Sequence, residues 1–317
     1  MTRSGDTPLA VVALGGNAIL RRGDDGTIRT QFMRSNAALR HVVPMLAGGH
    51  RLVLTHGNGP VVGNILIRSE AARDQVAPMP LYIADADSEG GIGLMLQMSL
   101  YNQLTLAGIS RRVSTVITQC IVDPDDPAFT TPTKPIGPYY TETQAAALEK
   151  AEGWSFVSVN GAGMRRVVAS PRPIRIVEAD TIASWARDGE VVIAAGGGGV
   201  PVVERADGTI VGIDAVFDKD WASAVLACAI DADTLVILME ADRVYADFGT
   251  PEQRAIDSLT VREAEKLLGT LERGSIAPKV AASAFFARTT GRDAIICGTE
   301  CLQDALAGRA GTRVTAR

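Results

Sequence analysis

Histidine and cysteine are scarce in this chain of 317 residues, and their scarcity argues against several kinds of chemistry. The three histidines are too few for a histidine-rich metal site, and they weaken any Ser/His/Asp interpretation. The four cysteines form no Cys-x-x-Cys pair and no Cys/His cluster, so no metal site built by the chain itself is expected. We expect these cysteines to be buried thiols in a reducing compartment.

An excess of positive charge and long apolar runs are also missing. The chain has 31 basic and 36 acidic residues, a net charge of -5 and an isoelectric point near 5.4. It therefore lacks the electrostatic surface that binds a nucleic-acid backbone, and no nucleic-acid partner is expected. No uninterrupted apolar run reaches the roughly 18 residues of a membrane span, and residues 1–8 show no cleavage pattern. We expect a cytoplasmic protein without a membrane partner.

Short β-branched runs alternate with helical patterns along most of the chain. The expected strands are 9–14, 51–55, 113–117, 191–195, 235–238 and 294–297, and the expected helices are 31–47, 61–74, 92–107, 220–229, 261–268 and 278–288. This alternation predicts an α/β fold with one mainly parallel sheet, helices on both faces, and ligands at the carboxyl ends of the strands. The proline-rich segment 122–173 interrupts the alternation and predicts an inserted lobe.

Three of the expected strands end in glycine-rich turns, at Gly15–Asn17, Gly57–Gly59 and Gly196–Gly199. Glycine lets backbone N–H groups approach an anion, and the N-terminus of a following helix adds partial positive charge. Any one of these turns alone is better explained by a tight strand-to-helix connection, but three at one edge of a sheet favour a phosphate site. The sequence has neither G-x-G-x-x-G nor a Walker A lysine, which disfavours Rossmann dehydrogenases and P-loop ATPases.

Only five lysines occur, and the other 26 basic residues are arginine. Lys150 and Lys266 lie beside glutamates on polar helix faces, where solvation explains them. Lys134 follows Thr-Pro-Thr in the proline-rich segment, whereas Lys219 and Lys279 fall at expected helix starts. A cation at a helix N-terminus opposes the helix dipole, so these two positions reduce stability slightly. A compact ammonium group there suits the binding of a transferring phosphoryl group.

Several segments resemble those of carbamate kinases, within the amino acid kinase superfamily. They are Val11–Ile19, His56–Pro60, Pro132–Pro138, Gly196–Gly199, Asp218–Asp220 and Gly274–Lys279. The resemblance runs from Leu9 to Val314 in the family's order and spacing. It implies a three-layer αβα sandwich formed by a single domain, 1–317, with a protruding lid subdomain over 122–173. It also implies a homodimer.

The same resemblance implies an activity and a role for individual residues. The implied reaction is reversible phosphoryl transfer between carbamoyl phosphate and ADP, giving ATP and carbamate, with Mg²⁺ on the nucleotide and a place in arginine catabolism. Lys219 and Lys279 are implied to hold the transferring group, Asp220 to orient both lysines, and Lys134 to reach over the substrate. The implied phosphate and substrate contacts are Gly15, Gly16, Asn17, Gly57, Asn58, Gly59, Gly197 and Gly198. The implied nucleotide contacts are Met239, Asp242, Tyr245 and Ala277.

One segment departs from the family pattern close to the implied acceptor site. Where carbamate kinases usually have neutral residues, this chain has Asp85, Asp87 and Glu89. A carboxylate 4 Å from an anionic acceptor repels it by about 1 kcal/mol or more. Asp87 or Glu89 facing the acceptor therefore predicts a different acceptor. In the alternative interpretation, Asp87 or Ser88 caps a helix and Glu89 lies in its first turn.

Two other functions remain open at this stage. The kinase machinery could transfer phosphate to a different small carboxylate or carbamate-like acceptor, as the acidic segment allows. The chain could also be a nucleotide-binding regulatory relative without catalytic turnover. The presence of Lys134, Lys219, Asp220 and Lys279 together weakens this last alternative.

Overall fold

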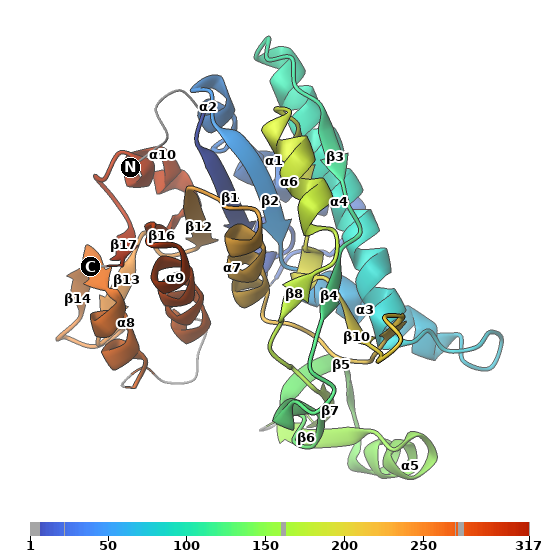
Figure 1. Ribbon diagram of the computed structural model, residues 1–317. Helices are drawn as coiled ribbons and strands as arrows, with labels where there is room; N and C mark the ends of the chain where they lie inside the picture. The colour runs from blue at the N-terminus through green and yellow to red at the C-terminus, as the bar shows by residue number, and fades with distance from the viewer. Residues whose placement is uncertain (1–6, 22, 160–162, 270, 272–275, 317) are drawn as a thin grey trace.

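The computed structural model describes residues 7–21, 23–159, 163–269, 271 and 276–316, and an eight-stranded sheet forms its centre (Figure 1). In spatial order the strands are β15 (Ser258–Thr260), β17 (Thr312–Thr315), β16 (Ala294–Gly298), β12 (Thr234–Met239), β1 (Leu9–Leu14), β2 (Arg51–His56), β9 (Val191–Ile193) and β3 (Val113–Thr115). All neighbouring strands pair in parallel except β16 and β17. The predicted mainly parallel sheet is confirmed, and β1, β2, β9 and β12 all end at the same edge.

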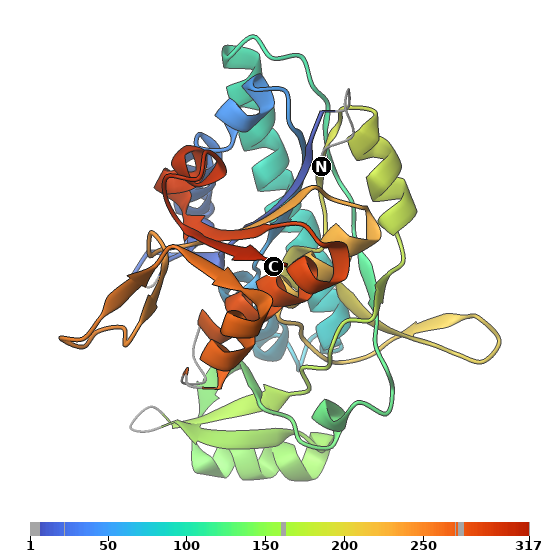
Figure 2. The ribbon, with the colours of Figure 1, turned by 60° about the vertical axis from the view of Figure 1, so that its left-hand side comes forward.

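Helices cover both faces of this sheet, as the alternation of side chains along β1 requires. Val11 and Ala13 enter one hydrophobic core, whereas Val12 and Leu14 enter the other. The first core is closed by α6 (Ala179–Arg187), α7 (Lys219–Ala229), α8 (Val261–Leu268) and α9 (Ile276–Thr290); the second is closed by α1 (Ile28–Leu39), α2 (Val43–Ala47), α4 (Leu81–Leu106) and α10 (Leu302–Leu306). Figure 2 shows the three layers from the side of α8 and α9.

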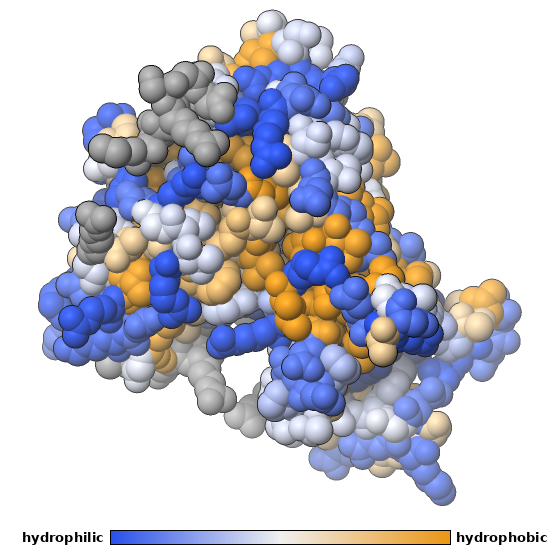
Figure 3. Space-filling view, viewed as in Figure 1, coloured by the Kyte–Doolittle hydropathy of each residue, from blue (hydrophilic) through white to orange (hydrophobic). Residues whose placement is uncertain are grey.

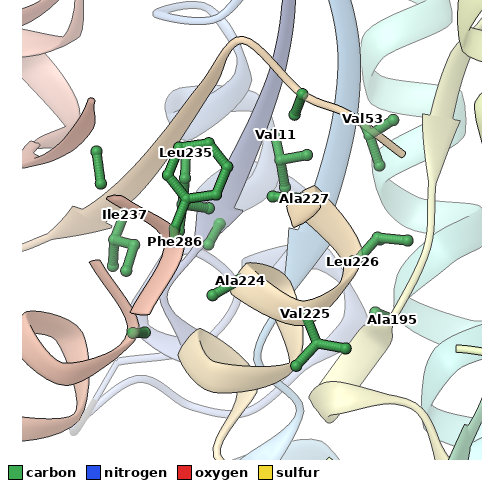
Figure 4. Close-up of a cluster of buried hydrophobic side chains, with 14 of the residues drawn as sticks. Val11, Val53, Ala195, Ala224, Val225, Leu226, Ala227, Leu235, Ile237 and Phe286 are labelled. Carbon is green, nitrogen blue, oxygen red and sulfur yellow. The ribbon is translucent and has the colours of Figure 1, made fainter. Parts of the chain in front are cut away.

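The first core fixes α7 and α9 against the sheet (Figure 4). Phe286 of α9 is fully buried in the same cluster as Leu235 and Ile237 of β12. Burial of such a side chain stabilises the fold by about 1.5–3 kcal/mol. Ala224 and Ala227 of α7 are also fully buried, and their small size allows the helix to lie close to the strands. The N-terminal turns of α7 and α9 are thereby positioned at the sheet edge where β1 and β2 end.

A small lobe protrudes below the main sheet (Figure 1). It contains β5 (Lys134–Tyr140), β7 (Gly163–Val168), β6 (Ser155–Val159) and α5 (Glu142–Glu152). Its strand β5 packs on α3 (Gly59–Ala71) through Ile136, which shares a buried cluster with Val62 and Leu66. The surface is hollowed between the lobe and helices α8 and α9 (Figure 3).

The remaining elements are short and connect the main layers. A second sheet holds β11 (Ile210–Gly212), β10 (Val200–Glu204), β4 (Gln119–Ile121) and β8 (Arg175–Ile176); a hairpin holds β13 (Val244–Ala246) and β14 (Arg254–Ile256); and single 3₁₀ turns are η1 (Gly16–Ala18), η2 (Pro127–Phe129), η3 (Gly196–Gly198) and η4 (Thr299–Cys301).

Two of the predicted helices have wrong boundaries. The helix predicted over 31–47 is interrupted between α1 and α2, and Pro44 lies in the first turn of α2, where its missing N–H costs nothing. The helix predicted over 92–107 begins at Leu81, so the acidic segment lies inside it. Of the resembling segment Gly274–Lys279, residues 274 and 275 lie outside the described residues.

Candidate active site

The three predicted glycine turns meet at one edge of the sheet. A Cβ atom on Gly57 would lie 2.9 Å from the backbone nitrogen of Gly16, so the turns after β1 and β2 are in direct contact. A Cβ atom on Gly197 would lie 2.2 Å from Nδ2 of Asn58, and Gly197 has a φ of +67°. Glycine is therefore required by close approach at both positions and by a left-handed backbone at the second.

Asp220 links the two lysines predicted to hold the phosphoryl group. Lys219 begins α7 and Lys279 lies in the first turn of α9, as the helix-start prediction requires. The Lys219 ammonium contacts Oδ1 of Asp220, and Nζ of Lys279 donates to Oδ2 at 2.7 Å. The Asp220 side chain is only 4% exposed, against 13% for Lys219 and 14% for Lys279. One buried carboxylate thus aligns two ammonium groups whose outer sides remain accessible.

The electrostatics of this triad favour its charged form. Burial raises the pKa of Asp220, but the two ammonium groups outweigh burial and hold it below its usual value. Burial lowers the pKa of Lys219, an effect opposed by Asp220 and increased by Lys279. The triad carries one net positive charge, which is available to an anionic ligand. Lys219 also lies against the Gly57 turn, because its Cδ would be 3.6 Å from a Cβ atom there.

The residues predicted to bind nucleotide follow β12 at the same sheet edge. The Tyr245 hydroxyl donates to Oδ1 of Asp242 at 2.7 Å, and Arg243 donates to Oδ2 of the same carboxylate at 3.0 Å. Nδ2 of Asn17 donates to Oε1 of Glu240 at 2.9 Å, which connects the β1 turn to this segment. Met239 ends β12 and Ala277 lies in the first turn of α9, so the predicted nucleotide contacts come from neighbouring elements.

Three predicted site residues are either exposed or explained by packing. The Lys134 side chain is exposed in β5, and its ammonium group makes no hydrogen bond or ion pair with the described residues. Gly59 is exposed at the start of α3. Gly198 packs against the ring of Phe217, because a Cβ atom there would lie 2.4 Å from the Cβ of Phe217. Contact with an anion is not needed to explain Gly198.

His56 is part of the site, although the sequence analysis assigned it no role. It is 1% exposed, and burial lowers its pKa to about 4, so the ring is neutral near pH 7. A Cβ atom on Gly196 would lie 2.4 Å from the ring, so the imidazole fills the space beneath the glycine turn. Its position directly before Gly57 was the only sequence signal that could have identified it.

The structure decides between the two interpretations of the acidic segment. Helix α4 begins at Leu81, whose N–H donates to Oδ1 of Asp214 at 2.9 Å. The interpretation in which Asp87 or Ser88 caps a helix and Glu89 lies in its first turn is therefore wrong. Asp87 is exposed, whereas Asp85 and Glu89 are 3% and 1% exposed on the opposite side of the helix. Of the two residues predicted to affect the acceptor, only Glu89 faces the glycine turns.

Asp85 and Glu89 occupy environments that disfavour a negative charge. Oδ1 of Asp85 accepts from Nδ2 of Asn58 at 3.2 Å, and Oε2 of Glu89 accepts from the N–H of Thr118 at 2.8 Å. The second oxygen of each carboxyl group is buried without a hydrogen-bond partner among the described residues. Burial raises the pKa of Asp85 to about 8, and burial raises the pKa of Glu89 well above its usual value. Asp85 is therefore mainly protonated near pH 7, and the pKa of Glu89 is shifted in the same direction, so burial weakens the repulsion of an anion by both groups.

Comparison with known proteins identifies the family of this chain. The model of the amino acid kinase family matches residues 8–298. The chain belongs to the amino acid kinase family. The carbamate kinase of Pyrococcus horikoshii is 43% identical over 309 residues, covering 96% of this chain and 98% of that protein. The carbamate kinase-like protein YahI of Escherichia coli is 44% identical over 311 residues, with the same coverage.

A solved structure in this family agrees with the fold. The carbamate kinase of Giardia lamblia bound to AMP-PNP has a TM-score of 0.94 and 36% identity, covering 98% of each chain. The resemblance to carbamate kinases and the predicted sandwich fold are thereby confirmed.

The described part of this amino acid kinase contains no group of three or more His, Cys, Asp or Glu side chains arranged to hold a metal ion. Within the same residues, no helix is both long and apolar enough to cross a membrane.

The buried Asp85 predicts that stability depends on pH. Its folded pKa of about 8 exceeds the unfolded value of about 3.9, so the folded chain retains a proton that the unfolded chain releases. Stability from this group is fully present below about pH 4 and is lost as pH rises to about 8. Asp85→Asn cannot ionise, so its melting temperature relative to wild type is expected to increase from about pH 5 to pH 8 and then level off.

Asp214 and Glu89 are the other acidic groups that interact with Asp85, and both remain in the variant. The difference between the two melting curves therefore isolates the Asp85 proton. At pH 8 the free energy of unfolding of Asp85→Asn should have risen, relative to wild type, by at least about 1.4 kcal/mol, the equivalent of one pKa unit. A melting-temperature difference that stays constant over this range would contradict the protonated state of Asp85.

Proposed function

We propose that this chain is a carbamate kinase that transfers a phosphoryl group between carbamoyl phosphate and ADP, forming ATP and carbamate reversibly. The observation that carries the proposal is the bridging of Lys219 and Lys279 by the buried Asp220 beside two glycine turns. Relatives that carry the name carbamate kinase over nearly the full length of this chain support the choice of substrate.

The reaction breaks the bond between phosphorus and the carbamate oxygen and forms a bond from phosphorus to a β-phosphate oxygen of ADP. Negative charge spreads over the three equatorial oxygens of the transferring group in the transition state. Lys219 and Lys279 are placed to stabilise this charge, because Asp220 holds both ammonium groups before the substrate arrives. The backbone N–H groups of Gly16 and Gly57 contribute further donors, while the neutral His56 supports the turns.

We further propose that Mg²⁺ enters with the nucleotide. The described residues contain no carboxylate cluster that builds a metal site, and the Asp220 carboxylate is already paired with both lysines. This donor set fits an ion held mainly by phosphate oxygens. When bound, Mg²⁺ neutralises charge on the nucleotide phosphates.

The experiment that tests the function is a coupled assay of ATP formation from carbamoyl phosphate, ADP and Mg²⁺. It is set beside a screen in which ATP is offered to carbamate and to other small carboxylates. Turnover of carbamoyl phosphate of order 1–100 per second supports the proposal. Turnover of another acceptor alone would support the alternative kinase, and no turnover at all would support the regulatory relative.

The surroundings of the acidic segment remove the reason for expecting a different acceptor. That reason was repulsion of an anionic acceptor by Asp87 or Glu89, but Asp87 is exposed on the other side of α4. Burial raises the pKa of Glu89 and of its neighbour Asp85, which disfavours a negative charge on either group. An anionic acceptor therefore meets little negative charge on the side of α4 and the positive triad on the other.

A homodimer is also proposed. Leu94, Met98 and Tyr101 form an apolar stripe on α4 and are 55%, 47% and 59% exposed. A stripe of this kind on a long helix is typical of a surface that another subunit covers. The cytoplasmic location and the place in arginine catabolism stay predictions.

The lobe, residues 122–173, is proposed to act as a lid that brings Lys134 to the substrate. It is held on one side by an ion pair, at 2.7 Å, between Glu152 of α5 and Arg73, which lies just after the end of α3. Lys134→Ala is expected to lower kcat by at least about tenfold, because one positive charge is lost from the closed site. Binding of ADP should be nearly unchanged, since the expected nucleotide contacts lie in the main body.

Isothermal titration calorimetry with ADP checks this separation, with Lys150→Ala as the control. Lys150 belongs to the same lobe but is exposed on α5 and makes no described ion pair. A large loss of ADP affinity in Lys134→Ala would instead place Lys134 in the nucleotide pocket.

A further inference from the structure

We propose that Asp85 is a positioning residue that, together with Ser88, orients the Asn58 amide so that its carbonyl oxygen faces the acceptor and recognises an N–H group. The proposal rests on the proposed function and specifies how the acceptor is selected. It concerns a hydrogen-bond network between the β2 turn and the buried side of α4.

The direction of each hydrogen bond fixes the orientation of the amide. The Ser88 hydroxyl donates its only hydrogen to the backbone oxygen of Asp85, at 2.7 Å. Ser88 Oγ can therefore only accept from Asn58, so the group at 2.9 Å from it must be Nδ2. Oδ1 of Asp85 accepts the second Nδ2 hydrogen at 3.2 Å. Both hydrogens of the amide are used on α4.

The Asn58 side chain can therefore offer a ligand only a hydrogen-bond acceptor, its Oδ1 atom. Its Oδ1 receives no hydrogen bond from the described residues, whereas Nδ2 has no donor left for a ligand. The amide is also held from the other side, because Gly197 lies so close that a Cβ atom there would be 2.4 Å from Cγ of Asn58. Rotation of the amide by 180° would place Oδ1 against Oγ of Ser88, whose only hydrogen is already donated to the backbone, which is unfavourable.

The protonation of Asp85 is consistent with this role. Its Oδ2 is buried without a partner among the described residues, and a proton there leaves Oδ1 as a carbonyl-type acceptor. Burial raises the pKa of this group, so the acceptor role is filled without a buried negative charge near the anionic substrate.

The location of Asn58 explains how this hydrogen-bond network would affect the choice of substrate. Asn58 follows Gly57, which contacts both Gly16 and the stem of Lys219. An acceptor bound by the triad would therefore lie within the turn that carries Asn58. A carbamate has two N–H hydrogens on its amino group, whereas acetate presents a methyl group at the same place. An exposed acceptor oxygen favours the first and leaves the second without a partner.

Carbamoyl phosphate and acetyl phosphate test this inference, because they differ only by an amino group in place of a methyl group. In Asp85→Leu, the value of kcat/KM for carbamoyl phosphate is expected to fall roughly five- to tenfold, as for one lost hydrogen bond. The inhibition constant of acetyl phosphate, measured as a competitor, is expected to change by less than about twofold. Asp85→Asn keeps an oxygen acceptor and is expected to retain the discrimination between the two ligands.

Asp87→Leu is the matched control, since it makes the same replacement on the exposed side of α4 and should leave the discrimination intact. If Asp85→Leu does not fold, Ser88→Ala removes the other acceptor and should show the same selective loss. Equal changes for both ligands, or none for carbamoyl phosphate, would overturn the inference. A wild-type chain that forms no ATP from carbamoyl phosphate would instead overturn the proposed function.

Discussion

Lys279→Ala and Lys219→Ala are each expected to lower kcat by roughly two to four orders of magnitude, because each removes a preorganised charge from the transition state. The fold should change little, since both ammonium groups lie at the surface of the site and Asp220 keeps one partner in either variant. Steady-state kinetics with carbamoyl phosphate and ADP give kcat, and a thermal melt verifies folding. Lys219→Arg is also expected to be poor, since a planar guanidinium does not replace a compact ammonium group.

Lys266→Ala is the matched control for these variants. Lys266 is exposed on α8, away from the glycine turns, so its removal should leave kcat near the wild-type value. Near-normal kcat in either active-site lysine variant would show that the phosphoryl group is held elsewhere.

Asp220→Asn is expected to lower kcat by about two orders of magnitude or more, although the side chain keeps its size. The amide has no charge to balance Lys219 and Lys279, whose ammonium groups then repel each other across the position of the buried side chain. Because Asp220 raises the pKa of Lys219, its loss should lower that pKa further. The alkaline limb of the kcat profile should therefore move to lower pH than in the wild type.

For Asp220→Asn, the pH profile of kcat distinguishes a loss of lysine positioning from a general loss of stability. A variant that is only less stable would melt earlier but keep the wild-type alkaline limb. An unshifted limb together with near-normal kcat would show that Asp220 does not control the two lysines.

Local sequence pattern was sufficient to single out the Gly57 turn, which directly follows the expected strand 51–55, and Lys219, which lies at an expected helix start. The role of Asp220, although it is adjacent to Lys219, was expected only from the resemblance to a known family. The meeting of Lys279 with Asp220 spans 59 residues, and it was expected from the resemblance to a known family rather than from local pattern.

The first three turns of α4 could not be predicted from local preference. Residues 81–91 contain aspartate, serine and two glycines, which favour capping positions and turns over a helix interior. The helix forms there because Leu81, Ala84 and Ser88 are buried against neighbouring elements. The orientation of Asn58 likewise depends on side chains about thirty positions away, which no local pattern contains.

Direct phosphoryl transfer at the Lys219–Asp220–Lys279 site is tested most directly by following the phosphorus atom through one turnover. Enzyme in excess is mixed with carbamoyl phosphate labelled with ³²P and with Mg²⁺ and ADP, and the reaction is stopped in acid on the millisecond scale. Direct transfer predicts that the label passes into the γ-phosphate of ATP at about 1–100 per second, with none on the protein. Label retained covalently on the protein, or carbamoyl phosphate left unconsumed, would contradict it.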